Sequence, residues 1–394
     1  MKHNWEYKRL EEVCKISPFP GIPQVIQEKS WLLNLDKIQS NNGHVIEYEY
    51  FNPDSIDGSV TKFNEQNVLF SKLRPNLNKV VVPEMSGYCT TELVPLFPEH
   101  DIDRYFLAYY LRNPHFVAFL VDKVGGAKMP RVKMNEFWKA MCPVPPMEIQ
   151  KQIVAELDKL NEMIATRKEQ LKVLDNLAQS LFYNTFGDPI SNPKGWPQTT
   201  LGAISEKISN GCGAKIEADT FKSEGIAFFR CQNVWKNHFD YSDMVYVDDN
   251  FNTRYKSSSL KHNDLIVTKI GRLYTENSSL GRVSLFQGED YSANLSGNLS
   301  FIRLLSGVSP KFVLYIMISD CFKCYVRNTT SGGIDKRALN NSQLKAFSLY
   351  LPPLELQNKF ASQVEAIERQ KELVEASISE LQTLLDSRMD YWFN

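Results

Sequence analysis

Apolar residues recur at helical spacing in two stretches of the chain, 145–186 and 352–394. Seven of them in the first stretch lie mostly three or four positions apart, and each has an apolar counterpart 207 positions further on. They are Ile149, Ile153, Leu157, Leu160, Leu171, Leu174 and Ala178, followed by Leu356, Phe360, Val364, Ile367, Ile378, Leu381 and Leu385. Each stretch opens with Pro-Pro and then contains neither Pro nor Gly. This pattern predicts two long amphipathic helices of about 60 Å.

A single helix with one apolar face has nothing to bury that face against, so the two helices are expected to pack as a coiled coil. The first helix leads into residues 187–351, and the second begins where that segment ends. Helices that pair along their length must then be antiparallel. The sequence therefore predicts a stiff spacer between two globular segments, 1–144 and 187–351.

The repeat continues into the globular segments. Residues 68–73 and 265–270 each form a short apolar run that ends in a hydroxyl residue, a Lys and an aliphatic residue. Residues 102–119 and 310–325 are predicted as short amphipathic helices, and a Gly pair follows each of them. The pairs, Gly125-Gly126 and Gly332-Gly333, precede the long helices by the same distance.

Between these shared features the two globular segments differ. Alternating residues predict strands at Val45–Tyr50 and Met244–Val247, and Asn42-Gly43 predicts a hairpin turn. The expected fold is α+β, with two pseudo-repeated globular domains separated by two long helices that form an antiparallel coiled coil. The expected boundaries are 1–144, 145–186, 187–351 and 352–394.

Composition is that of an ordinary soluble globular protein, with 394 residues, 43% hydrophobic and 23% charged. No signal peptide or long apolar run is present, and seven scattered Cys favour a reducing compartment, so we expect a cytoplasmic protein without membrane contact. The net charge is −1, but the two helical stretches carry −5 and the remainder +4. That distribution permits DNA contact by the globular domains and disfavours it along the helices.

Two motifs carry a family resemblance. Pro-Pro-x-Glu-x-Gln occurs at 145–150 and at 352–357, and Phe186-Gly187-Asp188-Pro189 precedes Gly195-Trp196-Pro197. In this order and spacing, the chain resembles the specificity (S) subunit of Type I restriction–modification enzymes over nearly its whole length. The second helix departs from the pattern, because no Gly-Asp-Pro follows it.

The resemblance implies that each globular domain is a target recognition domain that reads one half of a bipartite, asymmetric DNA site. The coiled coil would fix the gap and dock two methyltransferase (M) subunits, which two restriction (R) subunits could join in phage defence. Adenine methylation, with S-adenosylmethionine, would occur on the M subunits, so this chain would be no enzyme and would bind no cofactor. A protein-binding scaffold with two protein-gripping domains remains the alternative.

Candidate DNA contacts lie in the loops after the repeated strands and near the Gly pairs. Lys and Arg suit phosphate contact, and Arg is the usual reader of guanine, although exposed Lys and Arg also occur on any protein surface. The Gly pairs could approach a phosphate or could simply form tight turns. The predicted contacts are Lys72, Arg74, Asn76, Asn78, Lys79, Lys128, Arg131 and Lys133 in the first domain and Arg230, Lys269, Arg272, Tyr274, Lys336 and Arg337 in the second. Arg254 and Arg282 add positive charge that the sequence does not place on one face.

No catalytic or metal centre is predicted. Cys321 and Cys324 have zinc-like spacing, but no second Cys or His pair accompanies them. Asn113-Pro114-His115-Phe116 lacks the second Pro of an adenine-methyltransferase loop, so a helix interruption is the better interpretation. No phosphate-binding P-loop occurs in the sequence.

Overall fold

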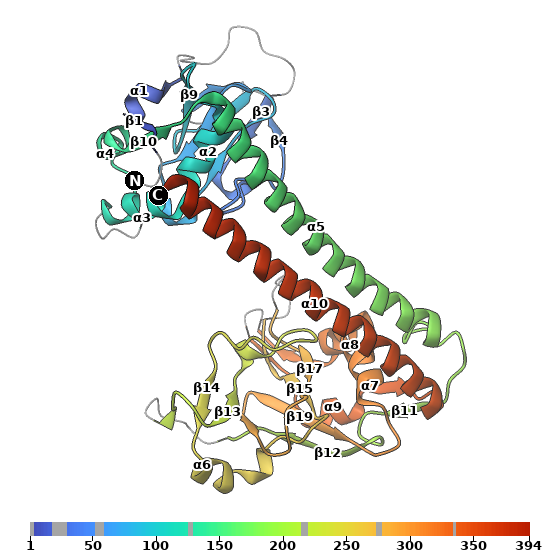
Figure 1. The fold of residues 1–394 in the computed structure, drawn as a ribbon. Coiled ribbons are helices and arrows are strands. Elements are labelled where there is room, and N and C mark those ends of the chain that lie inside the picture. The colour runs from blue at the N-terminus through green and yellow to red at the C-terminus, as the bar shows by residue number, and fades with distance from the viewer. Residues whose placement is uncertain are drawn as a thin grey trace. The chain divides into compact units, whose positions relative to one another are not determined.

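A computed structural model describes residues 4–17, 30–51, 59–124, 129–213, 220–272, 278–333 and 336–394. The contacts divide the chain into two compact units: unit 1 is Met1–Glu169 with Val374–Asn394, and unit 2 is Gln170–Leu373. The two predicted long helices are present as α5 (Met147–Phe186) and α10 (Leu354–Phe393), and each contributes one half to each unit (Figure 1).

The described residues of unit 1 form two four-stranded sheets and a two-stranded ladder. The first sheet has the order β2 (Cys14–Ile16), β9 (Leu93–Pro98), β6 (Val68–Ser71), β7 (Val80–Val81). The second has the order β4 (Glu49–Phe51), β3 (Ser30–Leu33), β8 (Gly87–Thr90), β5 (Val60–Phe63). The ladder pairs β1 (Glu6–Arg9) with β10 (Met141–Val144). The helices are α1 (Leu10–Val13), α2 (Arg104–Arg112), α3 (Pro114–Asp122) and α4 (Met134–Lys139), with 3-10 turns at Leu35–Lys37 and Pro75–Leu77.

Unit 2 repeats this plan with additions. Its four-stranded sheet has the order β12 (Ser205–Asn210), β19 (Leu299–Leu304), β15 (Leu265–Thr268), β17 (Val283–Leu285). Two three-stranded sheets have the orders β14 (Val245–Val247), β13 (Ile226–Phe229), β18 (Ala293–Leu295) and β16 (Ile270–Gly271), β21 (Arg337–Ala338), β20 (Ser331–Gly332). β11 (Gln198–Thr200) pairs with β22 (Ser348–Tyr350). The helices are α6 (Asp249–Arg254), α7 (Pro310–Met317), α8 (Asp320–Thr329) and α9 (Asn341–Ala346), with 3-10 turns at Cys231–Asn233 and Lys256–Ser258.

Sheet topology confirms the predicted α+β duplication. The order β2-β9-β6-β7 in unit 1 corresponds to β12-β19-β15-β17 in unit 2, and all neighbours in both sheets are antiparallel. A parallel pair also recurs, as β3 with β8 and as β13 with β18. The two units therefore share a backbone scaffold as well as a sequence pattern.

The short amphipathic segments are each divided into two helices rather than one. In unit 1 the Asn113 side chain accepts the N–H of His115 at 2.8 Å and starts α3, whose first residue is Pro114. The predicted interruption at this site is therefore confirmed. In unit 2 the corresponding break falls at Ser319, between α7 and α8.

The strand prediction for Val45–Tyr50 is wrong over most of its length. Val45 bridges Ile38, and the N–H of Ile46 donates to Lys37, whereas the strand itself starts at Glu49 and pairs with β3. The segment changes its pairing partner halfway, so a continuous strand does not form. The turn before it is present, with Gly43 at φ +68°, where an added Cβ would lie 1.7 Å from the carbonyl oxygen of Val80.

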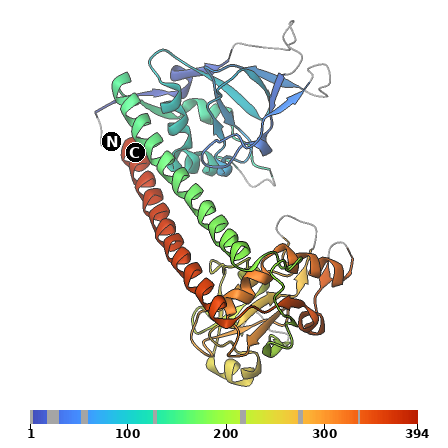
Figure 2. The ribbon, with the colours of Figure 1, turned by 90° about the vertical axis from the view of Figure 1, so that its right-hand side faces the viewer.

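The two long helices run side by side (Figure 2), and side-chain contacts join them in both units. In unit 1 the Glu156 carboxylate on α5 accepts hydrogen bonds from Arg388 (3.0 Å) and from the indole of Trp392 (3.0 Å) on α10. In unit 2 Asp175 pairs with Lys371 at 2.5 Å. Further along α5, the rings of Phe182 and Phe186 lie 5.7 and 5.2 Å from that of Phe360. As residue numbers increase along α5, the numbers of the α10 residues that they contact decrease, so the predicted antiparallel pairing is confirmed.

Each long helix begins with the same buried glutamine clamp. The Gln150 side chain accepts the N–H of Asp103 (2.7 Å) and donates to the carbonyls of Asp101 and Pro145 (2.8 Å each). The Gln357 side chain likewise accepts the N–H of Ser309 (3.0 Å) and donates to Pro352 (2.7 Å). Both side chains are almost fully buried. The clamps fix the start of each long helix to the segment that precedes α2 or α7.

We expect Gln150→Leu to lower the free energy of unfolding by about 2 to 4 kcal/mol, because the buried peptide groups that it satisfies lose their partners. Urea denaturation of the purified chain measures this change. The exposed Gln152 on the same helix gives the matched control, since Gln152→Leu should change stability by less than about 0.5 kcal/mol. Equal effects of the two substitutions would contradict the assigned role of the clamp.

The Glu156–Arg388 pair should make stability depend on pH. The hydrogen bond from Arg388 lowers the pKa of Glu156, so the stabilisation is present above the unfolded carboxyl pKa and is lost as the pH falls through the lowered folded value. Both side chains are about one-third exposed (34% and 30%), so we expect Glu156→Gln to cost at most about 1 kcal/mol at pH 7. The difference from the native chain should vanish near pH 3 in urea titrations, whereas the exposed Glu162→Gln should show no such trend.

Candidate nucleic-acid interface

Backbone hydrogen bonds in unit 1 bring two separate groups of predicted contact residues together. The N–H of Lys72, just after β6, donates to the carbonyl of Glu92 (3.0 Å), and the carbonyl of Lys72 accepts the N–H of Val132 (2.8 Å). The N–H of Arg74 donates to Pro130 (2.8 Å), and Leu73 bridges Arg131. The loop after β6 therefore lies beside residues 130–133, which sequence reasoning had treated as a separate site.

Unit 2 contains the same arrangement. We call it the junction: the loop after β6 beside residues 130–133 in unit 1, and the segment after β15 beside residues 337–339 in unit 2. The N–H of Lys269 donates to the carbonyl of Asn298 (3.0 Å), and the carbonyl of Lys269 accepts the N–H of Leu339 (2.8 Å). β16 then pairs with β21, with Ile270 opposite Ala338. Lys72 and Lys269 are thus structurally equivalent, and so are Glu92 and Asn298.

The predicted contacts divide by exposure. Most of those in the junction loops are exposed, whereas Lys72 and Lys269 are half-buried. The exposed ones are Arg74, Asn76, Arg131 and Lys133 in unit 1 and Arg272 and Lys336 in unit 2. Arg74 has φ +51°, a left-handed backbone conformation, immediately before the 3-10 turn at Pro75–Leu77. The exposed cations therefore lie at the edge formed by the junction in each unit.

Several predicted contacts have side chains that form bonds within the protein. The amide of Asn78 donates to the carbonyl of Arg112 (2.9 Å), and the Lys79 ammonium donates to the carbonyl of Leu35 (2.6 Å). Arg230 forms an ion pair with Asp243 at 3.0 Å. In addition, the Arg337 guanidinium donates to the carbonyl of Thr330 (3.2 Å) beside the junction of unit 2. These bonds give the four side chains a structural role.

Two cations at the junction of unit 2, Lys269 and Arg282, are partly buried. The Lys269 ammonium donates to the side-chain oxygen of Asn210 (2.7 Å), and burial lowers the pKa of Lys269. Arg282 lies over the ring of Trp235, with its guanidinium carbon 3.8 Å from the ring centre, and burial lowers its pKa too. No local sequence pattern indicates the contacts of Asn210 with Lys269 and of Trp235 with Arg282, because these partners are far apart in the chain.

The junction of unit 1 includes an acidic residue that the sequence analysis did not single out. Arg131 forms two hydrogen bonds with Glu92, from Nη2 to Oε1 (2.7 Å) and from Nε to Oε2 (3.2 Å). These bonds raise the pKa of Arg131, so its guanidinium stays charged. Arg131 is 60% exposed and Glu92 23% exposed. Glu92 is the second residue of the two-residue turn between β8 and β9, so a sheet connection fixes its position.

Some predicted positions fall in segments between the described ranges. Lys128, Tyr274 and the first Gly pair, Gly125-Gly126, lie outside the described residues. Of the second Gly pair, Gly332 forms part of β20 and has φ +137°. Arg254 ends α6, and its guanidinium carbon lies 5.5 Å from the ring centre of Tyr255.

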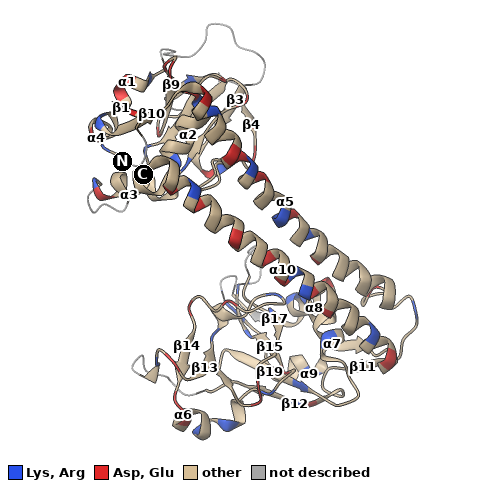
Figure 3. Ribbon diagram, in the orientation of Figure 1, with Lys and Arg blue, Asp and Glu red and all other residues tan. Residues whose placement is uncertain are grey.

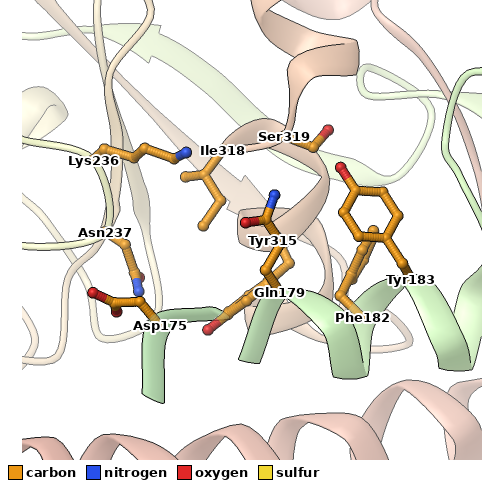
Figure 4. A pocket seen from close by; sticks show the side chains of 9 residues that line it. All are labelled: Asp175, Gln179, Phe182, Tyr183, Lys236, Asn237, Tyr315, Ile318 and Ser319. Carbon is orange, nitrogen blue, oxygen red and sulfur yellow. The ribbon is translucent and has the colours of Figure 1, made fainter. Parts of the chain in front are cut away.

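Unit 2 also contains a cavity of about 230 Å³ between α5, the α7–α8 turn and the loop at Lys236 (Figure 4). Its lining mixes polar and apolar side chains, among them Asp175, Gln179 and Tyr315. Within the described ranges no three His, Cys, Asp or Glu side chains gather as potential metal ligands. Cys321 and Cys324 lie on α8 as free thiols. Of the helices described, none has the length and apolar character needed to cross a membrane.

The comparisons with known proteins agree with this architecture. Residues 2–176 match the family described as "Type I restriction modification DNA specificity domain". The Type I restriction enzyme MjaVIII specificity subunit of Methanocaldococcus jannaschii is 21% identical over 367 residues, which cover 86% of this chain and 85% of that protein. The EcoDI specificity subunit of Escherichia coli is 24% identical, and the match covers 57% of this chain and half of that protein.

Two solved structures share the fold over almost the whole chain. One, from work on "complex assembly and conformational transition of the type I R-M system", has a TM-score of 0.58 at 19% identity and covers 99% of this chain and 97% of its own. The other, a Type I restriction–modification S subunit from M. genitalium, has a TM-score of 0.55 at 12% identity and covers 98% and 95%.

Fold and junctions together define a protein of two related α+β units, each completed by halves of the same two antiparallel helices. The predicted resemblance is confirmed: residues 2–176 match the Type I DNA specificity domain, and the chain is similar over most of its length to a Type I specificity subunit.

Proposed function

We propose that the chain selects the DNA sequence on which a Type I restriction–modification complex acts. Each globular domain reads one half of a bipartite site, through the junction loops at Lys72 and Lys269. Because the two domains present different side chains, the site is asymmetric. The family description names DNA specificity, and the relative from Methanocaldococcus jannaschii is named a specificity subunit, which supports this proposal.

The observation that supports this proposal is that both units have the same backbone at the junction but different side chains on it. Equivalent backbone bonds, with lengths of 3.0 and 2.8 Å, hold Lys72 and Lys269. At the positions around them, Glu92 in unit 1 corresponds to Asn298 in unit 2, and Arg131 corresponds to Ala338. A duplicated frame that varies at its exposed edge is suited to reading two different half-sites.

The long helices supply the spacing and the docking surface in this proposal. A helix of 40 residues extends about 60 Å, longer than the 34–36 Å of one DNA turn. Figure 3 shows acidic and basic residues along both helices, and Val173, Leu177 and Leu384 are exposed apolar side chains on them. We assign these faces to two M subunits, with S-adenosylmethionine bound on the M subunits, and two R subunits complete the complex.

We expect the complex with its cognate M subunits and S-adenosylmethionine to methylate adenine in one bipartite, asymmetric motif on plasmid DNA. Sequencing that detects methyl-adenine gives the motif. Replacing residues 1–144 by the same region of another specificity subunit should change one half of the motif and leave the other half unchanged. A motif that survives the replacement intact would refute the assignment.

A salt titration separates this function from the protein-binding scaffold. If loops in both units contact phosphates, the DNA affinity of the complex should fall steeply with salt, because each neutralised phosphate contributes about 0.9 to the logarithmic slope. Association that ignores salt, or no DNA binding at all, would instead favour the scaffold. The mild net charge of −1 makes this measurement the decisive one.

A further inference from the structure

Two hydrogen bonds from Arg131 to Glu92 hold the guanidinium in one orientation, which suits it to contact a base. The carboxylate occupies one side of the guanidinium, through Nε and Nη2. An arginine has five N–H donors, so this arrangement leaves the terminal edge, formed by Nη1 and the second hydrogen of Nη2, available. In the described part of the chain, no hydrogen bond from Nη1 is seen. The terminal edge is the one that pairs with O6 and N7 of guanine.

The charge of the pair distinguishes base reading from phosphate contact. Glu92 neutralises Arg131, so the two together attract a phosphate weakly and release little counterion on binding. Hydrogen bonding to a base edge needs orientation rather than net charge, and two bonds to a carboxylate restrict the otherwise flexible side chain. Glu92 is itself partly buried and lies in the connection between β8 and β9, which restricts the movement of its carboxylate.

Unit 2 lacks this device at the equivalent place, where Asn298 and Ala338 replace Glu92 and Arg131. The rest of the junction backbone is retained. Whatever the pair contributes should therefore affect only the half-site that the first domain reads. This asymmetry allows a test within a single complex, in which the second half-site is the internal reference.

We propose, on the basis of the proposed function, that Arg131 is a specificity-determining residue that reads a guanine in the first half-site and that Glu92 is its positioning residue. Arg131 donates two hydrogen bonds from its terminal edge to that base. Glu92 keeps the edge pointed outward from the loop. The pair contributes sequence discrimination, whereas the neighbouring exposed cations, Arg74 and Lys133, serve the phosphates.

The test uses the complex of the full chain with its M subunits. Methylation rates are measured on the native site and on duplexes changed at one base pair at a time. Arg131→Ala and Arg131→Lys should each reduce discrimination at one G·C pair of the first half-site by about 5- to 150-fold, since one good bidentate contact has that effect. Lys retains the charge but not the planar pair of donors, so loss with both variants identifies geometry as the cause.

Glu92→Gln should relax the same base pair to a smaller extent, because the amide keeps one acceptor. The matched control is Arg9→Ala, which removes another exposed arginine of unit 1 that is paired with a carboxylate, Glu11, at 3.3 Å. The control should leave the motif unchanged. Thermal unfolding should shift by no more than about 3 °C in any variant, because exposed pairs contribute little to stability.

Two results would overturn the inference. One is a motif that stays unchanged in Arg131→Ala. The other is a uniform loss of rate on every duplex, with a salt slope reduced by about 1, which would make Arg131 a phosphate contact. A native complex that shows no bipartite motif would refute the proposed function itself, so the two failures are distinguishable.

Discussion

Burial of the two long helices against each other is the constraint on which both units depend. Neither helix can bury its apolar face by itself, and the short helices of each unit pack against that face. Ile153 and Leu157 are fully buried in unit 1, and Phe360 and Val364 in unit 2. At about 25 cal/mol per Å² of apolar surface, each such side chain stabilises its unit by roughly 1.5 to 3 kcal/mol. The glutamine clamps then fix where each helix starts.

Duplication separates what the fold requires from what the site can change. The strand order, the break between the paired short helices and the backbone bonds around Lys72 and Lys269 recur in both units. The side chains at the junction edge do not recur, because they satisfy no core contact. A scaffold of this kind lets the two exposed edges diverge while the stability of each unit stays the same.

The sequence predicted the features that depend on local periodicity and missed those that depend on distant pairing. The helices and their direction follow from the apolar stripe, although Phe182 and Phe186, both fully buried, lie outside the predicted set. The contact between residue 73 and residue 131 arises only once the sheet has formed, so no local pattern could show it. Likewise, Asn78 and Lys79 look like neighbours of Arg74 in sequence, but their side chains bond to Arg112 and Leu35. The residue types indicated which groups could contact DNA, but only the fold shows which of these side chains bond within the protein.

The end of α10 belongs to the core of unit 1, where Phe393 packs on Phe106 (5.3 Å between ring centres) and Trp392 stacks on Trp5 (6.1 Å). A ribosome makes these aromatic side chains only after every residue of unit 2. Unit 2 ends at Leu373 and has all its residues before unit 1 does. Unit 1 therefore begins to be synthesised before unit 2 but can complete its fold only after all of unit 2 has been synthesised.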